Sequence, residues 1–291
     1  MADRTDFSVV IPAHNAARTI GRQLAALGRQ NWAGPWEVVV ADNGSTDDTA
    51  ARALDFVDTL PSLRVVDASD RRGASHARNV GARAARAPYL LFLDADDEAS
   101  EGWLQAMADA AASAALIAGV TRARREGPGD AEAGLGRPSA WSRIAPSAGF
   151  LDAAASSNLG VRRDVWEAVG GFREDMAANE DTAFCWDVQL AGHDLVHVPD
   201  AVVSYSMRGS LRGLARQQFA WGVGAAQLYA LFRDRGAPRP SVAGALLRWV
   251  ALLVMAPAGI AIPRLRRDWV GRLARRAGRL HGSLRYRVLS L

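Results

Sequence analysis

The sequence predicts an α/β protein with a doubly wound, mostly parallel sheet and a helical C-terminal extension. Short apolar segments alternate with segments of helical periodicity over the first hundred residues, which is the order of elements that builds such a sheet. The apolar segments are hydrophobic on both faces, as burial between two layers of helices requires. Polar residues follow three of these segments directly, at the edge where such sheets bind ligands.

The alternating elements can be placed in order. The apolar residues of the first helix recur at helical spacing. Ser45 or Thr46 is expected to cap the second helix, whose first turn carries Asp47 and Asp48, the charges that a helix N-terminus favours. The predicted strands are 7–12, 36–42, 63–68 and 89–94, and the predicted helices between them are 16–30, 46–60 and 74–87.

The composition excludes several classes of protein. Of the 291 residues, 49% are hydrophobic and 23% are charged, which is the balance of a soluble globular protein. Cys185 is the sole cysteine, so an internal disulfide and a cysteine-cluster metal site are excluded, and a reducing compartment is favoured. All 35 basic residues are arginine, which excludes Schiff-base chemistry and a P-loop lysine. The first ten residues lack the apolar region of a signal peptide, so we expect a cytoplasmic protein.

Charge divides the chain into two regions of opposite sign. Residues 1–206 contain 19 arginines and 29 acidic residues, a net charge of −10. Residues 207–291 contain 16 arginines, with Asp234 and Asp268 as their acidic residues, a net charge of +14. The opposite signs indicate two roles, and the basic region favours an anionic partner.

Polar and mostly acidic side chains follow three of the predicted strands. The first strand is followed by "PAHN", the second by "DNGSTDD" and the fourth by "DADD". These strand ends meet at one edge of the sheet. The sequence contains no G-x-G-x-x-G after the first strand and no Walker A motif. Aspartate oxygens suit Mg²⁺ or Mn²⁺, so we expect Asp94 and Asp96 to face a divalent cation that carries a diphosphate.

Five segments, in order, resemble the GT-A glycosyltransferases, which have a Rossmann-like core, and within them the inverting family 2. The resemblance covers about residues 7–222 and departs from the family at His14, where tyrosine is common. A lone D-x-D is weak evidence, but five motifs in order are specific. The segments are "SVVIPAHNAARTI", "VVVADNGSTDDT", "GASHARNVGARAARAPYLLFLDADD", "NLGVRRDVWEAVGGFRE" and "NEDTAFCWDVQLAGH".

The resemblance implies a role for each matching residue. Asp181 would be the catalytic base. Asp94 and Asp96 would form the D-x-D motif, with Asp96 as the direct metal ligand. Asn158 and Glu180 would lie in the region of the acceptor and the diphosphate. The nucleotide would be bound by Pro12, Ala13, Asn15, Asp42, Arg78 and Asp94.

Glycosyl transfer needs the same chemical groups independently of the resemblance. A sugar nucleotide has a good leaving group when a bound cation neutralises its diphosphate. The attacking hydroxyl must lose its proton to a positioned carboxylate. Direct displacement at the anomeric carbon then inverts its configuration, so that no second carboxylate is needed as a nucleophile.

Several of these aspartates have structural interpretations as well. Asp42 could cap a turn, as Asx residues often do. Asp97 could open the next helix, and Asp181 could be a first-turn charge at a helix N-terminus. The sequence leaves open whether a third metal ligand exists. The candidates are His193 and His197, and Tyr205 lies near the place where several members of the family that the chain resembles have histidine.

The C-terminal part is predicted to be helical. The helix expected at 210–236 contains "RQQFAWG", which resembles a family segment near the acceptor. Ala220 stands where the processive synthases have arginine, and this difference argues against a processive synthase. The residues of this segment could equally be helix surface and core. The candidates for the acceptor region there are Gln217, Gln218 and Trp221.

Two interpretations are open for the last residues of the chain. The apolar stretch after Arg248 has 14 residues, short of the roughly 20 that a spanning helix needs. The stretch from 264 alternates arginine with apolar residues at helical spacing. This pattern predicts either a membrane-surface anchor or a helical cap packed on the catalytic domain. The apolar residues expected to enter the membrane are Leu265, Trp269, Leu273 and Leu280.

Together these observations predict a cytoplasmic inverting hexosyltransferase, peripheral on the inner face of the cell membrane. It would use a UDP-, GDP- or dTDP-sugar and a glycan or lipid-linked acceptor, and no nucleic acid. The alternatives are a nucleotidyltransferase of related fold, for which a Gly-rich triphosphate loop is lacking, and a non-catalytic sugar-nucleotide or membrane-docking module. The predicted domains are a catalytic domain at 1–236, with a nucleotide-binding half at about 1–100 and an acceptor half at about 101–236, and a basic helical region at 237–291.

Overall fold

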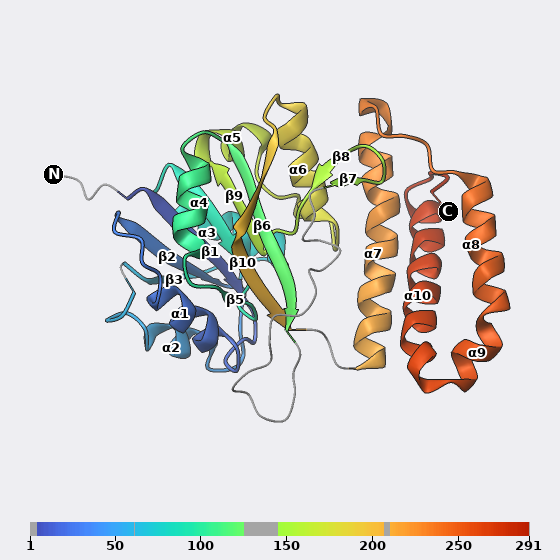
Figure 1. The fold of residues 1–291 in the computed structure, drawn as a ribbon, viewed down its shortest axis with the longest axis horizontal. Helices are drawn as coiled ribbons and strands as arrows, with labels where there is room; N and C mark the ends of the chain where they lie inside the picture. The colour runs from blue at the N-terminus through green and yellow to red at the C-terminus, as the bar shows by residue number, and fades with distance from the viewer. Residues whose placement is uncertain (1–4, 61, 125–144, 207–209, 291) are drawn as a thin grey trace. The chain divides into compact units, whose positions relative to one another are not determined.

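One mixed sheet of eight strands, with helices on both faces, precedes a group of C-terminal helices (Figure 1). The computed structural model describes residues 5–60, 62–124, 145–206 and 210–290. The chain divides into two compact units. The larger unit contains the sheet, and the smaller unit consists of residues 147–150, 175–180 and the chain from 208 onward.

The order of the strands across the sheet is β3-β2-β1-β4-β9-β6-β10-β5. The strands β3, β2, β1 and β4 are parallel to one another, as predicted. Strand β9 runs antiparallel to β4 and β6, β10 is parallel to β6, and β5 is antiparallel to β10. The strands are β1 (Phe7–Ala13), β2 (Trp36–Asp42), β3 (Arg64–Asp67), β4 (Tyr89–Leu93), β5 (Glu98–Ala99), β6 (Leu116–Arg124), β9 (Asn158–Arg162) and β10 (Leu195–Ser206), with β7 (Ala145–Ser147) and β8 (Leu151–Ala153) paired separately.

The helices of the larger unit lie between these strands in the predicted order. The four strands predicted in the first hundred residues are confirmed. The first helix is shorter than predicted at both ends, because turns at residues 17–19 and at Arg29 flank it. The third helix begins at Ala74 as predicted but ends at Ala84, because Ala85 has an extended backbone. The helices are α1 (Ile20–Gly28), α2 (Thr49–Leu54), α3 (Ala74–Ala84), α4 (Trp103–Ala111), α5 (Arg163–Val169) and α6 (Glu180–Leu190).

The second helix begins later than the sequence predicted. Residues 45–48 form a loop rather than a capped first turn, and α2 begins at Thr49. The Asp47 carboxylate accepts hydrogen bonds from the backbone N–H groups of Ala17 and Thr49. Such bonds between side chains and backbone compete with helix formation. Here they join the loop after β2 to the loop after β1.

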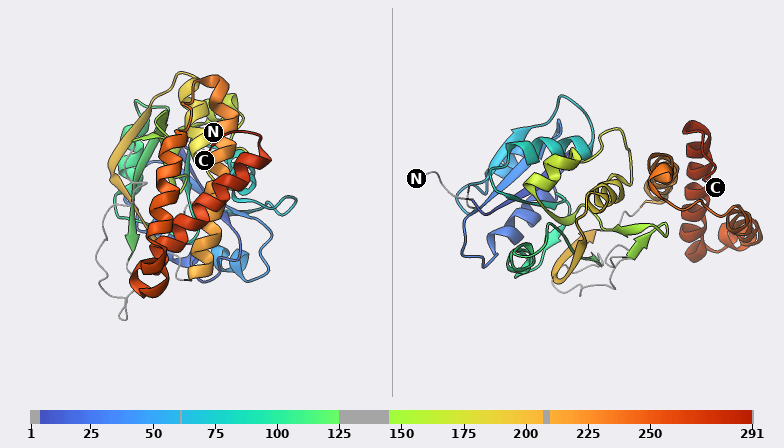
Figure 2. Two further views of the ribbon diagram at one scale, coloured as in Figure 1. Left: turned by 90° about the vertical axis from the view of Figure 1, so that its right-hand side faces the viewer. Right: turned by 90° about the horizontal axis from the view of Figure 1, so that it is seen from above.

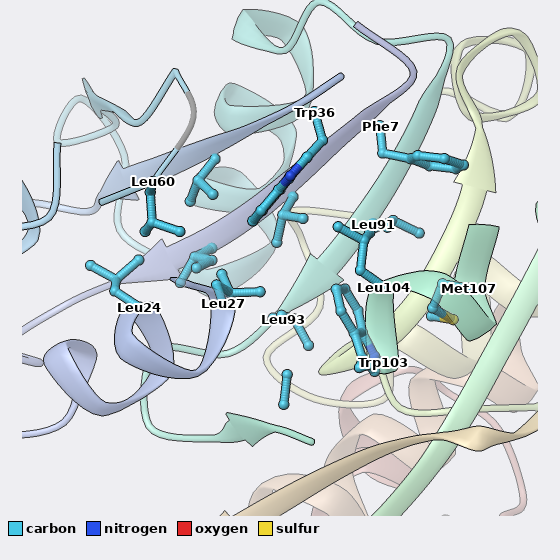
Figure 3. Packing of buried hydrophobic residues seen from close by; sticks show 14 of the residues in the cluster. Phe7, Leu24, Leu27, Trp36, Leu60, Leu91, Leu93, Trp103, Leu104 and Met107 are labelled. Carbon is cyan, nitrogen blue, oxygen red and sulfur yellow. The ribbon is translucent and has the colours of Figure 1, made fainter. Parts of the chain in front are cut away.

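Neighbouring residues of the central strands are buried on opposite faces of the sheet. On one face Leu91 packs in a cluster with Leu24 of α1 and Trp103 of α4 (Figure 3). On the other face Phe92 packs in a second cluster with Phe184 of α6. Burial on both faces is what the uninterrupted apolar strands predicted. The carboxyl ends of β1, β2 and β4 therefore belong to a sheet that is packed from both sides.

The smaller unit consists mainly of helices, and α10 lies between α7 and α8 (Figures 1 and 2). Glycines let α10 approach α7 closely: a Cβ atom on Gly278 would lie 2.1 Å from the carbonyl oxygen of Phe219. Across the described residues, none of the helices combines the length and the hydropathy that membrane crossing demands. The helices are α7 (Leu211–Phe232), α8 (Val242–Val254), α9 (Ala256–Ala261) and α10 (Pro263–Arg285).

Candidate active site

Side-chain hydrogen bonds join the loops after β1 and β2 at the predicted nucleotide site. Asp42, the last residue of β2, accepts hydrogen bonds from the backbone N–H and the hydroxyl of Ser45, at 3.0 and 2.6 Å. Asn15 accepts one from the backbone N–H of Thr46 at 2.8 Å, and its own N–H donates to the Ser45 hydroxyl at 3.0 Å. The structure thus brings Asn15 and Asp42 together. It also confirms that Asp42 caps a turn.

The remaining residues predicted on the first loop lie next to this pair. Pro12 and Ala13 end β1, and Ala13 is opposite Asp42 in the register of the two strands. The following residue, His14, is exposed, and both of its ring nitrogens lie within 3.2 Å of the guanidinium Nη1 of Arg72. The same nitrogen donates to two carbonyl oxygens of the loop after β2. Arg72 therefore links both loops, a role that the sequence did not reveal.

Asn43 joins three segments at this edge and was also missed. Its buried amide nitrogen donates to the carbonyl oxygens of Ala68 and Arg71 at 2.6 and 2.7 Å. Its amide oxygen accepts a hydrogen bond at 2.8 Å from the backbone N–H of Gly73. Gly73 has a φ of 139°, a conformation that glycine adopts readily, and it directly precedes α3. Asn43 thus fixes the start of the helix that carries Arg78.

Three aspartates follow β4, and they differ in burial. Asp94 has 32% of its side chain exposed and accepts a hydrogen bond of 2.7 Å from Nη2 of the buried Arg78. Asp96 is exposed, whereas Asp97 is buried. Gln23 of α1 donates to the backbone carbonyl of Asp94 at 3.2 Å. Two residues predicted at the nucleotide site, Arg78 and Asp94, therefore form an ion pair.

The pKa of Asp97 reflects the crowding of carboxylates at this strand end. Burial, and then the charges of Asp94 and Asp96, raise the pKa of Asp97 to about 9. Asp97 does not open the next helix, because Glu98 begins β5 and α4 starts only at Trp103. That structural alternative is therefore wrong.

The carboxylates at this edge fit a divalent cation shared with a ligand. No cluster of three or more histidine, cysteine or acidic side chains suited to a metal is found within the described part of the chain. Asp94 and Asp96 offer hard oxygen donors from two residues. Mg²⁺ and cations like it are commonly held by one or two carboxylates together with the phosphates of a substrate. The donor set is of that kind.

Tyr205 on β10 lies within electrostatic reach of the site. Burial, and then the charge of Asp97, raise the pKa of Tyr205. His197 is exposed on the same strand, and His193 is half-buried in the turn after α6. The structure thus brings Tyr205 near the aspartates, and the question of a third ligand stays open.

Asp181 lies in the first turn of α6 and is half-buried. Its Oδ1 accepts a hydrogen bond of 2.7 Å from the backbone N–H of Thr182. Further along the helix, Gln189 donates to the carbonyl oxygen of Asp152 at 2.7 Å, which ties α6 to the segment before β9. The first-turn position is the one that the structural interpretation required. The role of Asp181 as a base stays a prediction.

Asn158 begins β9, opposite Leu93 in the pairing with β4. Its amide oxygen accepts a hydrogen bond of 2.8 Å from the indole N–H of Trp103. Its amide nitrogen donates to the carbonyl oxygens of Val120 and Ala201 at 3.2 and 2.8 Å. The buried side chain therefore links β9 to α4, β6 and β10, next to the end of β4. Its predicted place at the acceptor is untested.

The other residues predicted near the acceptor belong to the smaller unit. The Gln218 amide oxygen accepts a hydrogen bond of 2.8 Å from Nε of Arg275 on α10, and the Arg275 guanidinium lies 5.0 Å from the ring centre of Trp221. Helix α10 thus packs on the side of α7 that carries both residues. Gln217 is half-buried, and so is Glu180 at the start of α6.

A buried histidine cluster beside α3 was not foreseen. The His76 ring nitrogens lie 2.8 Å from a carboxylate oxygen of Asp70 and 2.9 Å from one of Glu174. Burial opposes a charge on the ring, but the hydrogen bonds to these two carboxylates outweigh it and raise the pKa of His76. Glu174 also accepts hydrogen bonds from Asn79 and Arg71. The cluster holds α3 to the segment after α5.

Comparison with known proteins identifies the family. The family model described as "Glycosyl transferase family 2" matches residues 8–182. The chain belongs to glycosyl transferase family 2. A second model, "Glycosyl transferase family group 2", matches residues 143–270. Membership favours glycosyl transfer over nucleotidyl transfer, and it confirms the resemblance carried by the five motifs.

Similarity to two named glycosyltransferases extends over most of the chain. The pre-mycofactocin glycosyltransferase of Mycobacterium tuberculosis is 27% identical over 259 residues, which cover 86% of this chain and 53% of that protein. This chain therefore spans about half the length of that relative. Glycosyltransferase AglE of Haloferax volcanii is 29% identical over 299 residues, which cover 96% of each chain.

A solved structure supports the GT-A fold. The mannosyltransferase PcManGT of Pyrobaculum calidifontis, in complex with GDP-Man and Mn²⁺, matches with a TM-score of 0.65 and 18% identity. The match covers 97% of this chain and 88% of that chain. At this identity the likeness shows the fold alone. The fold of this family 2 chain is therefore GT-A, and helices follow the sheet along the sequence.

Proposed function

We propose that this glycosyltransferase moves a hexose from a nucleotide-sugar donor to an acceptor hydroxyl in one displacement that inverts the anomeric carbon. The observation that carries the proposal is the shared edge of β1, β2 and β4. Asp42 is opposite Ala13 across β1 and β2, and the Arg78–Asp94 ion pair follows β4, which is parallel to β1. A donor bound outside the carboxyl ends of these strands meets both groups.

On this proposal the two loops bind the nucleoside and the pair after β4 binds the diphosphate. Asp42 contacts the base, and Asn15 shapes the pocket that Pro12 and Ala13 line. Arg78 brings a positive charge to the diphosphate side, and its ion pair keeps Asp94 in a fixed orientation. The hydrogen bonds among Asn15, Asp42 and the loop after β2 support this assignment, because they order both loops before a ligand binds.

Asp94 and Asp96 are proposed to hold a divalent cation, Mg²⁺ or Mn²⁺. When bound, the cation neutralises the charge that develops on the leaving diphosphate. The exposed position of Asp96 and the anchored position of Asp94 support this division, in which Asp96 is the more direct ligand. The raised pKa of Asp97 supports it as well, since crowded carboxylates favour a bound cation.

Asp181 is proposed to accept the proton of the acceptor hydroxyl. Its place in the first turn of α6 supports this role, because a helix N-terminus stabilises a carboxylate. The hydrogen bond from the Thr182 backbone N–H fixes one carboxylate oxygen. A base held in one orientation needs little reorganisation during the reaction.

The acceptor is proposed to be a glycan or a lipid-linked sugar, and the chain to act peripherally at the inner face of the cell membrane. The net charge of +14 in residues 207–291 supports an anionic surface as partner. The division into a catalytic domain up to about residue 236 and a basic region beyond it stays part of this proposal. The residues proposed near the acceptor are Asn158, Glu180, Gln217, Gln218 and Trp221.

Ligand binding and product analysis test the proposal. Bound donor stabilises the folded state by mass action, so the melting temperature should rise with one class among UDP-, GDP- and dTDP-sugars in the presence of Mn²⁺. The same titration in EDTA is the control and should give a smaller rise. Incubation with acceptor should then yield product of inverted anomeric configuration by NMR. A product of retained configuration would rule out single displacement.

A further inference from the structure

Helix α8 exposes large aliphatic side chains along one side. The exposed fraction is 70% for Leu247 and 75% for Val254. A helix of a soluble protein normally turns its aliphatic side towards the core, and large exposed apolar patches mark interaction sites. We define the outer α8 face as Leu246, Leu247, Val250, Leu253 and Val254, with Ile260 of α9, each more than half exposed.

The opposite side of α8 is packed within the smaller unit. Leu252 is buried, and its carbonyl oxygen accepts a hydrogen bond of 3.0 Å from the indole N–H of Trp269 on α10. The Trp269 ring also lies on Gly259 of α9, where a Cβ atom would approach it to 2.4 Å. Trp269, expected from the sequence on a membrane-facing side, therefore packs between α10 and the helices α8 and α9. These contacts hold α8 in place, with its outer face exposed.

The charged side chains of this segment are all arginine. Residues 241–267 contain four arginines and no acidic residue. Among them, Arg266 donates a hydrogen bond of 2.8 Å to the carbonyl oxygen of Ile260, a member of the outer α8 face. Arg264 and Arg267, its neighbours in the sequence, are exposed as well. Guanidinium groups bind phosphate through paired hydrogen bonds. The outer α8 face is thus aliphatic and flanked by cations.

We propose that the outer α8 face binds the surface of an anionic phospholipid bilayer, with α8 in the plane of the interface and the flanking arginines on lipid phosphates. This proposal rests on the membrane association given under Proposed function and names the surface that carries it. The 13 residues of α8 span about 20 Å. That length is too short for a hydrocarbon core of about 30 Å but suits an interfacial helix.

Charge favours a bilayer over a second copy of the chain. Two outer α8 faces brought together would also bring their arginines together, and residues 241–267 contain no carboxylate to pair with them. Anionic headgroups supply the missing charge, while the acyl region receives the aliphatic side chains. The combination of an apolar side and flanking arginines is typical of helices that lie on membranes.

The sole cysteine allows a direct test by site-specific labelling. Cys185 is buried, so Leu247→Cys gives the full chain one accessible thiol for an environment-sensitive fluorophore. On vesicles of phosphatidylglycerol and phosphatidylcholine in equal parts, the emission at position 247 should shift to shorter wavelength. The matched label uses Leu284→Cys on α10, where the exposed fraction is 75%, and should keep its aqueous spectrum. A shift at 284 without one at 247 would assign the membrane to α10 and overturn the proposal.

Sedimentation with the same vesicles gives a second test. The combined variant Leu247→Ser, Val250→Ser, Val254→Ser should bind at least about tenfold less than the wild type, because each substitution removes aliphatic surface that the bilayer would bury. A control that replaces three exposed aliphatic side chains elsewhere should bind like the wild type. Equal binding by both variants would overturn the proposal. The control substitutions are Leu54→Ser, Val57→Ser and Leu190→Ser, which alter exposed side chains of the larger unit.

Two further readouts separate this proposal from the others. Vesicle binding is measured without donor or acceptor. A chain that binds vesicles but transfers no sugar would therefore contradict the proposed function and still support the membrane-binding role of the outer α8 face. Melting temperatures of both variants should match the wild type, which excludes unfolding as the cause of lost binding. Self-association of the wild type in sedimentation velocity, abolished by the α8 substitutions and accompanied by indifference to vesicles, would show that a second copy covers the face.

Discussion

Arg78 and Asp94 are joined by a hydrogen bond of 2.7 Å between guanidinium Nη2 and carboxylate Oδ1. The arginine is buried in α3, and its guanidinium also lies 5.7 Å from the ring centre of Phe172. The aspartate is partly exposed at the end of β4. The pair therefore places a carboxylate at the edge of the sheet with an orientation set from inside the protein.

Replacing Arg78 tests that relationship. Arg78→Met leaves Asp94 without its bonded cation and should lower the free energy of unfolding by about 1.5–3 kcal/mol, the contribution of a hydrogen bond to a charged group. Donor affinity should fall too, because a positive charge beside the diphosphate is lost. Urea unfolding and nucleotide titration measure the two effects. Arg83→Met, on the exposed side of the same helix, is the matched control; an equal effect of both substitutions would contradict the prediction.

Asp96→Asn tests the metal site. Asp96 is exposed, so the free energy of unfolding should change by less than about 0.5 kcal/mol, as is usual for surface positions. Mn²⁺ binding, followed by calorimetry, should weaken, and sugar transfer should be abolished. Asp58→Asn changes another exposed carboxylate and should leave both properties intact. Full turnover of the Asp96 variant in EDTA would remove this residue from the metal site.

Asp181→Asn tests the base. The amide keeps the shape of the side chain but does not accept a proton, so transfer should fall by roughly 10²–10⁴-fold, the usual contribution of general base catalysis. Donor affinity, measured by titration, should stay close to that of the wild type. A parallel loss of donor affinity would place Asp181 at the nucleotide or the metal instead.

Asp97 should make stability depend on pH in the absence of metal. Its pKa is about 9 in the folded chain and about 3.9 in an unfolded one. Between these values the folded state holds one more proton than the unfolded state, so the free energy of unfolding falls as pH rises. Asp97→Asn removes that dependence and should stabilise the chain more at about pH 8 than at about pH 5. Urea unfolding in EDTA measures the difference; a gain that is equal at both values would mean that Asp97 is already ionised.

His76 should add to this loss of stability with rising pH, because its protonated, charged ring is the form that its partners stabilise. Its pKa is raised, with Asp70 and Glu174 as hydrogen-bond partners and Arg71 as a further charge beside Glu174. The stability contributed by the charged ring is complete below about pH 6.5 and is lost as pH rises through the folded pKa. The cost of His76→Gln should therefore be larger at about pH 6 than at about pH 9. NMR titration of the ring in the wild type gives the folded pKa directly, and a value below the ordinary one would contradict the prediction.

The first four strands could be predicted because their pattern is local and unambiguous. They are apolar on both faces and bounded by turn residues, and the structure places them within the predicted ranges or one residue beyond. The second helix could not be predicted equally well. Where its first turn was expected, the Asp47 carboxylate accepts a hydrogen bond from the backbone N–H of Ala17, 30 residues away. No local propensity reports a bond of that kind.

The candidate site divides in the same way. The positions of Asp42 and Asp94 at the sheet edge could be predicted, because each carboxylate stands at the end of an apolar strand, where charged side chains are unusual unless they face a ligand. Asn43 and His76 could not be predicted, because a single polar residue forms no repeating pattern in the sequence. The hydrogen-bond partners of each also come from segments that are distant in sequence. The tail illustrates a different limit. An amphipathic pattern in α10 predicts an apolar side but does not distinguish α7 from lipid as its cover.

Strand β9 carries a consequence for how the chain acquires its fold during synthesis. Strands β1 to β4 pair with one another, whereas β6 lies between β9 and β10 in the sheet that the described residues form. Residues 116–124 must therefore wait for a segment made later, 158–162, before they join the rest. Contacts between distant segments slow folding. The segment that contains β1 to β4 can begin to order on the ribosome. Strand β6, in contrast, depends on β9, which begins about forty residues later in the chain.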